Sequence, residues 1–180
     1  MGKVLVHKSQ EGVTSGRIVE VEAYIGPDDP ASHAYKNRKT ARTTVQYGKR
    51  GLAYIYQIYG KQCCFNIVTG KEGKPEVILI RALDPIGGID LMMKRRGIST
   101  TRNIKNLTNG PAKLCQAMGI DKSLYGEELF GKKLYIVEDE IRIKKEEILA
   151  TPRINIDYAG NAKNKLWRFI IKNNPFVSKR

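Results

Sequence analysis

The chain has 180 residues, a net charge of +14 and 41% apolar residues, enough for one domain with an ordinary core. No apolar run approaches the roughly 18 residues of a membrane span, and the N-terminal "MGKVLVHKSQEG" lacks the apolar core of a secretory signal. These features argue against a membrane-spanning or secreted protein. We therefore expect a single domain over residues 1–180 and a cytoplasmic or nucleoid location.

The cysteines do not have the spacing of a disulfide framework or a metal site. Cys63 and Cys64 are adjacent, Cys115 is remote, and the sequence contains only two histidines as further candidate ligands. We therefore expect three buried, small apolar side chains, no metal site and no cofactor.

The positive charge is concentrated in two segments that contain no Asp or Glu, residues 30–71 and 91–120. A basic cluster is often only a solvated face. Two long acid-free segments in a chain of net charge +14 are more typical of a surface that contacts phosphates. We expect nucleic acid, rather than a membrane or an acidic protein, as the partner.

Strand patterns dominate the first half of the chain. Apolar and β-branched runs predict strands over residues 3–7, 16–25, 53–58, 63–68 and 77–82. The stretch "YGKQ" (59–62) predicts a hairpin turn, and "TGKEGKPE" (69–76) predicts a longer hairpin loop. Hairpins imply an antiparallel sheet.

Helices are predicted later in the chain. Residues 87–97 have one apolar face, a basic last turn and a terminal glycine, while residues 109–119 have a proline at the first helical position. Residues 133–139 return to a strand pattern, and residues 151–160 are compatible with strand or loop. The sequence predicts a mixed α/β fold with a central antiparallel sheet.

The strand over residues 16–25 carries two carboxylates. Alternation places Glu20, Glu22 and Tyr24 on one face, and Val19, Val21, Ala23 and Ile25 on the other. An unpaired buried carboxylate is very costly, so we expect Glu20 on a solvated face with a salt bridge. For Glu22 we consider a second arrangement, in which the proline-containing turn brings His33 back towards Glu22 and Tyr24. A carboxylate, a phenol and an imidazole in one pocket suit hydrolysis of a glycosidic bond.

Three tyrosines fall close together in the first acid-free segment. Tyr54 and Tyr56 share a strand face, and for Tyr54 an ordinary strand position is the simpler interpretation. Tyr59 lies at the hairpin tip beside Gly60, where little core is available. It is either an ordinary exposed turn residue or a group that stacks on or wedges between bases.

Five stretches of the chain, in this order, closely resemble the 3-methyladenine (alkyladenine) DNA glycosylase family of the non-helix-hairpin-helix type. They are "GRIVEVEAYIGPDDPASHAYKNRKTAR", "YIYQIYGKQCCFNIV", "ILIRALDP", "NGPAKLCQAMGID" and "TPRINIDYAG…WRF". The resemblance implies a curved, open barrel-like antiparallel sheet with peripheral helices. It also implies a monomeric, metal-free and monofunctional enzyme of base excision repair. Such an enzyme flips alkylated purines (3-methyladenine, 7-methylguanine) out of double-stranded DNA and hydrolyses the N-glycosidic bond, and the deaminated purine hypoxanthine is a further candidate substrate.

The resemblance assigns catalytic roles to three residues. Glu22 matches the general base that activates the attacking water, and Arg81 matches an arginine that orients this water. His33 matches a pocket histidine that contacts the flipped base and helps to hold the water.

The resemblance assigns the remaining roles to the base pocket and the DNA. Tyr24 and Tyr56 match aromatics that stack on the base, and Asn66 matches an asparagine that excludes guanine. Tyr59 matches the tyrosine that fills the gap left in the duplex, and Arg38 and Arg42 match basic positions near the DNA backbone. Independently, the helix start at residues 109–111 with Lys113 behind it is either a phosphate site or an ordinary capped helix.

Two features depart from the family pattern. The family usually has a helix before the "GKVLV" segment, and this sequence starts at Met1, so either the start is truncated or this branch of the family lacks the helix. After His33, "AYKNRK" replaces a segment with arginine and paired glycines, which predicts altered backbone contacts.

A non-catalytic nucleic-acid-binding module with stacking tyrosines is the alternative to an enzyme. The combination of Glu22, His33 and Arg81 discriminates between them, because a pure binder has no use for a carboxylate that faces DNA phosphates.

Overall fold

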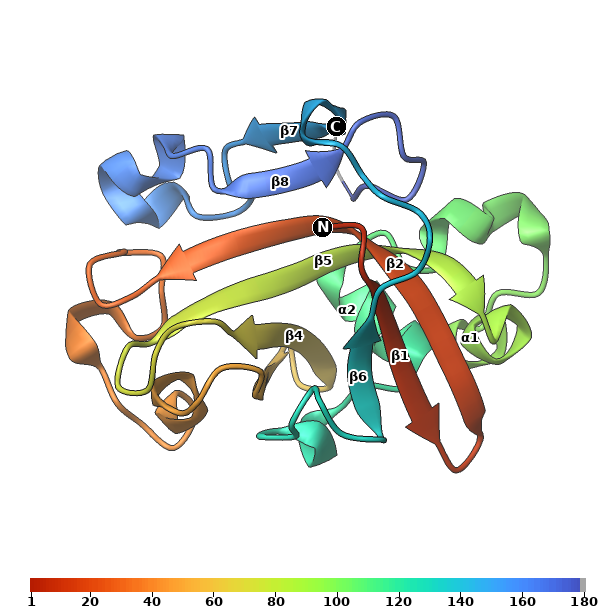
Figure 1. The fold of residues 1–180 in the computed structure, drawn as a ribbon, viewed down its shortest axis with the longest axis horizontal. Helices are drawn as coiled ribbons and strands as arrows, with labels where there is room; N and C mark the ends of the chain where they lie inside the picture. The colour runs from red at the N-terminus through yellow and green to blue at the C-terminus, as the bar shows by residue number, and fades with distance from the viewer. Residues whose placement is uncertain (179–180) are drawn as a thin grey trace.

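The computed structural model describes residues 1–178, and within this range eight strands form one curved sheet (Figure 1). The main order is β3–β4–β5–β2–β1–β6, every pairing is antiparallel, and β8 joins β7 to β2. The strands are β1 (Val4–Ser9), β2 (Gly12–Ile25), β3 (Ala53–Ile58), β4 (Gln62–Val68), β5 (Glu76–Gly87), β6 (Leu134–Val137), β7 (Ile148–Thr151) and β8 (Arg168–Ile171). The expected mixed α/β class with a curved antiparallel sheet is confirmed.

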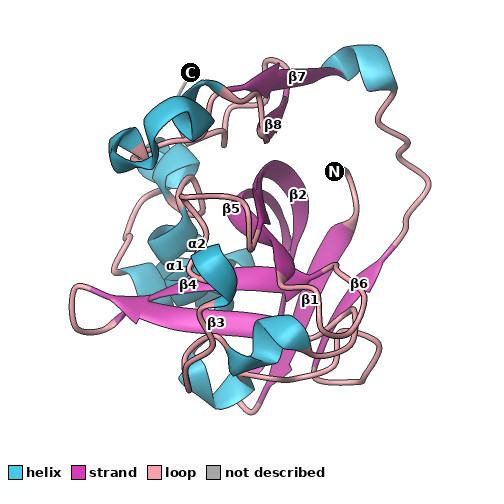
Figure 2. Ribbon diagram, turned by 90° about the vertical axis from the view of Figure 1, so that its left-hand side faces the viewer, coloured by secondary structure: helices cyan, strands magenta, loops and turns pink. Residues whose placement is uncertain are grey.

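Two α-helices, α1 (Ile89–Arg96) and α2 (Pro111–Met118), lie on one side of the sheet (Figure 2). Helix α2 packs on β4 and β5, and α1 packs on α2. Both helices end at a glycine in the left-handed conformation, as the sequence predicts. The 3-10 helices in the described range are η1 (Tyr35–Asn37), η2 (Thr44–Tyr47), η3 (Thr101–Asn106), η4 (Lys122–Leu124), η5 (Lys145–Glu147) and η6 (Asp157–Asn164). No helix within residues 1–178 has the length and apolarity that crossing a bilayer requires.

Strand β2 holds the two halves of the sheet together. One of its edges pairs with β1 over residues 12–17 and then with β8 over Glu20, Val21 and Glu22. Its other edge pairs with β5 along most of its length. Because β2 changes partner partway along, the β7–β8 ribbon stands apart from β1 and β6 (Figure 1).

Two irregularities in the β2–β5 register shape the middle of the sheet. Ile18 pairs with Leu83, Glu20 with Ala82, and Val21 with Ile80. Val19 on β2 and Arg81 on β5 are therefore each an extra residue without a register partner. Bulges of this kind bend a strand and re-aim side chains.

The first bulge corrects the simple alternation expected for β2. Val21 packs in the main core with Ile18, whereas Val19 packs with Ala82 and Ile171 in a separate cluster. A strict period of two places Val19 and Val21 on the same face, and the extra residue breaks that rule.

The main core lies between the sheet and α2, and Leu5, Phe65, Leu83 and Leu114 are fully buried in it. Each such side chain stabilises the fold by roughly 1.5–3 kcal/mol through burial. All three cysteines are free and buried, which confirms their expected role as small apolar side chains.

The expected strand bounds are right for β3 and within two residues for β1, β4 and β6, but β2 begins earlier than predicted and β5 runs on to Gly87. The extension of β5 contains Pro85, which ordinarily indicates a strand end. It is tolerated because, beyond Leu79, one edge of β5 has no partner strand within residues 1–178.

The end of the chain differs most from expectation. Residues 151–160 are mainly a loop that leads into η6, and the short strands β7 and β8 on either side were not predicted. Each of these strands has four residues, β7 pairs with β8, and β8 also pairs with the long β2. So short a pattern carries little signal in the sequence.

Candidate active site

A cavity of about 320 Å³ opens beside the bulged part of the sheet. Residues from β2, β3, β4 and β5 form its base, while the segments after β2 and after β7 form its walls. The lining includes Tyr24, His33, Tyr56, Asn66 and Arg81. Sequence positions that lie far apart in the chain therefore meet at one cavity.

Glu22 lies at the base of this arrangement and is completely buried. Its Oε2 accepts hydrogen bonds from the Tyr24 hydroxyl (2.9 Å) and from Nη1 of Arg81 (3.1 Å). Its Oε1 accepts one from the backbone N–H of Ile154 (2.7 Å). Three donors thus hold the carboxylate in one orientation, and Oε1 keeps capacity for a further donor.

Arg81 bridges both carboxylates of β2. Its Nε donates to Oε1 of Glu20 at 3.0 Å while its Nη1 donates to Glu22. The register explains this placement, because Arg81 is the extra residue of β5 opposite the interval between Glu20 and Val21. A bulge thus aims one guanidinium at both acids.

Glu20 is not on a solvated face, which corrects that expectation; its salt bridge was predicted correctly. Its side chain is completely buried, with Arg168 Nε (2.7 Å) and the Ser178 hydroxyl (2.8 Å) as further donors to Oε1. The backbone N–H of Ser178 donates to Oε2 at 2.6 Å. Burial alone raises the pKa of Glu20, but these donors and the charge of Arg81 hold it below its ordinary value.

Tyr24 is a hydrogen-bond donor to Glu22 and also a wall of the cavity. Burial first, and then the negative charge of Glu22, raise the pKa of Tyr24 well above its ordinary value, so the hydroxyl keeps its proton. The guanidinium of Arg153 lies 4.7 Å from the centre of the Tyr24 ring and 5.0 Å from that of Trp167.

Arg153 and Asp29 form a fully buried ion pair that the sequence did not reveal. Nη1 and Nη2 of Arg153 donate to the two carboxylate oxygens of Asp29 at 2.5 and 2.8 Å. Asp29 also accepts from the backbone N–H groups of Ile25 and Ala31, so it fixes the turn after β2. The only sequence signal was the acidic "GPDDP" turn, which by itself is typical of a solvent-exposed loop.

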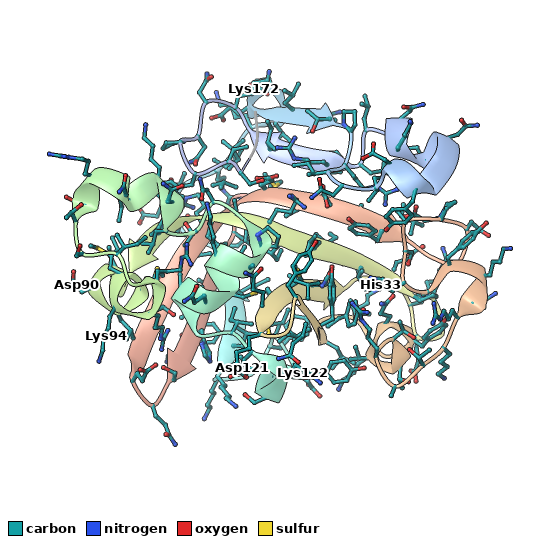
Figure 3. All side chains as sticks on the ribbon, turned by 180° about the vertical axis from the view of Figure 1, so that it is seen from behind. His33, Asp90, Lys94, Asp121, Lys122 and Lys172 are labelled. Atoms are coloured by element: carbon teal, nitrogen blue, oxygen red, sulfur yellow. The ribbon has the colours of Figure 1, made fainter. Side chains whose placement is uncertain are left out.

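His33 lies where the segment after β2 folds back to the cavity, at the opposite end of the view from α1 (Figure 3). Its Nδ1 is 2.8 Å from the Tyr54 hydroxyl, and its ring meets the Tyr56 ring edge-on with centroids 4.7 Å apart. Burial, together with the charges of Arg42 and Arg38, lowers the pKa of His33 to about 4. The imidazole is therefore neutral at neutral pH.

Tyr54 and Asn66 extend this polar group. The structure confirms Tyr54 as a buried strand residue, yet its hydroxyl also bonds His33, a contact that the sequence interpretation did not foresee. Nδ2 of Asn66 donates to the Tyr54 carbonyl at 3.1 Å, which orients the amide. The guanidinium of Arg42 lies 4.6 Å from the centre of the Tyr56 ring.

The other predicted positions lie outside the cavity. Tyr59 occupies the tip of the β3–β4 hairpin and is 92% exposed, with Gly60 at a positive φ beside it. Arg38 is exposed on the segment after η1. Nζ of Lys113, in α2, donates to Oδ1 of Asn109 at 2.8 Å.

The predicted meeting of Glu22, Tyr24 and His33 is only partly direct. Tyr24 bonds Glu22, but within residues 1–178 no hydrogen bond joins His33 to Glu22. His33 and Tyr24 both line the cavity, and Glu22 lies behind Tyr24 and Arg81. Across the described residues, no group of three or more His, Cys, Asp or Glu side chains is placed to hold a metal ion.

A fully buried carboxylate thus lies beside a cavity lined by tyrosines, in a strongly basic chain. Comparison with protein families is specific: residues 1–175 match the family model described as Methylpurine-DNA glycosylase (MPG). The chain belongs to this family. It is accordingly a DNA glycosylase, a hydrolase of the N-glycosidic bond, and the non-catalytic alternative falls away.

Individual relatives agree in name and extent. The chain is 45% identical over 178 residues to a protein of Natranaerobius thermophilus and 49% identical over 183 residues to one of Clostridium acetobutylicum. A protein of Alkaliphilus oremlandii is 47% identical over 185 residues. The alignments cover 99–100% of this chain and 88–91% of the relatives, each of which is named "Putative 3-methyladenine DNA glycosylase".

The lowered pKa of His33 predicts how it titrates. Because the chain has only two histidines, proton NMR of the imidazole C2–H signals, assigned with a His7→Gln variant, follows each ring separately. We expect His33 to titrate at about pH 4 rather than near 6.5. Between pH 6.5 and about 4, His33 is protonated in the unfolded chain but neutral in the folded chain. The contribution of His33 to the free energy of unfolding is therefore complete above pH 6.5 and is lost as the pH falls towards 4. His33→Gln should flatten that limb of the stability curve, and titration near 6.5 would contradict the buried neutral imidazole.

The buried ion pair predicts a large effect of Arg153→Met on stability. The substitution leaves Asp29 buried without its bidentate partner, which costs about 3–5 kcal/mol of unfolding free energy. Urea unfolding followed by circular dichroism measures it. Lys49→Met is the matched control, because the Lys49–Glu128 pair is exposed and such pairs contribute about 0–1 kcal/mol. A loss for Arg153→Met no larger than the control would contradict the importance of the pair.

Proposed function

We propose that this protein excises methylated purines, 3-methyladenine foremost, from double-stranded DNA, and does so by drawing the damaged nucleotide into the cavity beside Glu22. The observation that carries the proposal is the fixed carboxylate of Glu22 under an aromatic cavity. The family match and the names of the relatives support the substrate class.

The chemical step uses Glu22 as the general base. A water molecule attacks C1′ of the deoxyribose, the C1′–N bond breaks, and the purine leaves with the bonding electrons. Glu22 receives the proton of the water, and Oε1 is the oxygen with capacity left for it, because Oε2 already accepts from Tyr24 and Arg81. The carboxylate also offsets the positive charge of the oxocarbenium-like transition state.

The cavity favours a cationic, planar base. Methylation at N3 or N7 places a positive charge on the purine, which makes the base a good leaving group. The rings of Tyr24 and Tyr56 already make cation–π contacts with the guanidinium groups of Arg153 and Arg42. Cation–π attraction of this kind contributes on the order of 1–2 kcal/mol when desolvated.

His33 and Asn66 complete the pocket, since the neutral imidazole contacts the base without adding charge. Asn66 is held by the Tyr54 carbonyl, so its amide crowds the exocyclic amine of normal guanine. Hypoxanthine and 7-methylguanine are further candidate substrates.

The surface around the cavity suits duplex DNA. A glycosylase cannot reach the anomeric carbon inside a base stack, and extrusion costs a few kcal/mol. Tyr59, exposed at the tip of the β3–β4 hairpin, would fill the gap left behind and offset part of that cost. Arg38, Arg42 and Lys113 would contact the phosphates on either side. A single-domain monomer working at the nucleoid is sufficient for this reaction.

The proposal predicts which free bases the protein releases. Incubation with methylated genomic DNA, followed by chromatography of the released bases, should yield 3-methyladenine. Glu22→Gln should abolish release while binding of a duplex with an abasic-site mimic stays within about threefold, because the isosteric amide keeps its place but cannot take the proton. Full activity of Glu22→Gln would refute the role of the carboxylate, and the absence of any released purine would refute the substrate class.

The wedge role predicts a selective effect of Tyr59→Ala. Loss of the ring should weaken binding to a duplex with a stacked damaged base by about tenfold, since stacking contributes roughly 1–3 kcal/mol. Binding to a duplex whose nucleotide is already extruded should change much less. Fluorescence anisotropy measures both affinities, and Gln57→Ala on the exposed part of the same hairpin is the control. Equal losses on both duplexes would argue against a wedge.

A further inference from the structure

Gln46 is a buried amide whose hydrogen-bonding groups are unused. It lies in η2, is completely buried, and lines the same cavity as Tyr24 and His33. Neither its Nε2 nor its Oε1 has a hydrogen-bond partner among residues 1–178. A donor and an acceptor are therefore unpaired in a buried side chain beside the cavity.

An amide in this state is costly in the free protein. Leaving a buried donor or acceptor unpaired costs about 1–3 kcal/mol, so most buried polar groups are satisfied. Burial raises the pKa of Tyr54 to about 12, and the nearby Arg42 and Gln46 act in the opposite direction. Gln46 thus lies close to the Tyr54 hydroxyl, yet the contact does not have hydrogen-bond geometry.

The neighbouring polar groups are arranged differently from Gln46. Nδ1 of His33 is engaged with the Tyr54 hydroxyl, and Nδ2 of Asn66 is engaged with the Tyr54 carbonyl. Each of these side chains has one end tied to Tyr54. Neither end of the Gln46 amide is tied by a hydrogen bond to Tyr54 or to another described residue.

We infer that Gln46 is a specificity-determining residue, whose amide pairs with a purine edge that presents a donor and an acceptor side by side. This inference rests on the proposed function, because it assumes that an extruded purine enters the cavity. The 6-amino group and N7 of an adenine derivative form such an edge, and glutamine amides recognise it with two hydrogen bonds. N1–H and O6 of hypoxanthine form another.

The same chemistry identifies bases that Gln46 disfavours. In 1,N6-ethenoadenine a fused ring replaces the amino group and removes the donor. Unsubstituted purine has no group at C6 at all. When either base is bound, one or both of the Gln46 amide groups stay unpaired. The free-energy cost of burying these groups without a partner therefore persists in the complex.

The test compares binding of three duplexes that differ in one base: hypoxanthine, 1,N6-ethenoadenine or purine. Each base is attached to a 2′-fluoro sugar, because the electron-withdrawing fluorine slows formation of the oxocarbenium ion and separates binding from excision. Gln46→Met keeps the length and volume of the side chain and removes the amide. Gln57→Met, on the exposed face of β3, is the matched control.

We expect Gln46→Met to weaken binding of the hypoxanthine duplex about tenfold, the loss of a good bidentate contact. Binding of the other two duplexes should change less than threefold. The melting temperature of the free variant should rise by about 2–4 °C, because an unpaired buried amide is replaced by an apolar group.

Three results would overturn the inference. These are an equal change on all three duplexes, no preference of the unaltered protein for the hypoxanthine duplex, or a lower melting temperature for Gln46→Met. Release of 3-methyladenine from methylated DNA by the unaltered protein is scored separately. The release of 3-methyladenine therefore tests the proposed function, and the ratios of the binding affinities test the role of Gln46.

Discussion

The structure depends on a buried charge cluster between β2 and β5, in which Arg81 bridges Glu20 and Glu22. Two completely buried carboxylates on one strand are tolerable only because each accepts several hydrogen bonds and shares a guanidinium. The bulges at Val19 and Arg81 create that geometry, and they also end the pairing of β2 with β1 and begin its pairing with β8. The same irregularity therefore sets the curvature of the sheet and the orientation of Glu22.

The site combines two kinds of polar group with different tasks. The groups around Glu22 are fixed by hydrogen bonds within the protein, and under the proposed function little reorganisation is needed when charge develops at the sugar. The groups His33 and Gln46, which line the cavity, are neutral, and the Gln46 amide makes no hydrogen bond within residues 1–178. Tyr24 connects the two sets, because it donates to Glu22 and also lines the cavity.

Local patterns in the sequence were sufficient for the hairpins, the two α-helices and the apolar cysteines, because turn glycines, helix caps and apolar runs act over a few residues. The family resemblance pointed to Glu22, His33 and Arg81, all of which the structure places at or beside the cavity. Sequence patterns did not predict three features: the burial of Glu20, the Asp29–Arg153 ion pair and the unpaired amide of Gln46. Each arises from contacts between segments distant in sequence, and a carboxylate in a strand or an acidic turn looks the same whether it is solvated or buried.

The bonds from Ser178 to Glu20 connect the last described residue of the chain to the centre of the sheet. Strand β8, which supplies Arg168 to the same carboxylate, follows β1 to β5 in the chain. A fragment that ends after β5 contains Glu22 and Arg81, but its Glu20 lacks the donors from Arg168 and Ser178. The charge cluster is thus complete only when residues 168–178 are in place.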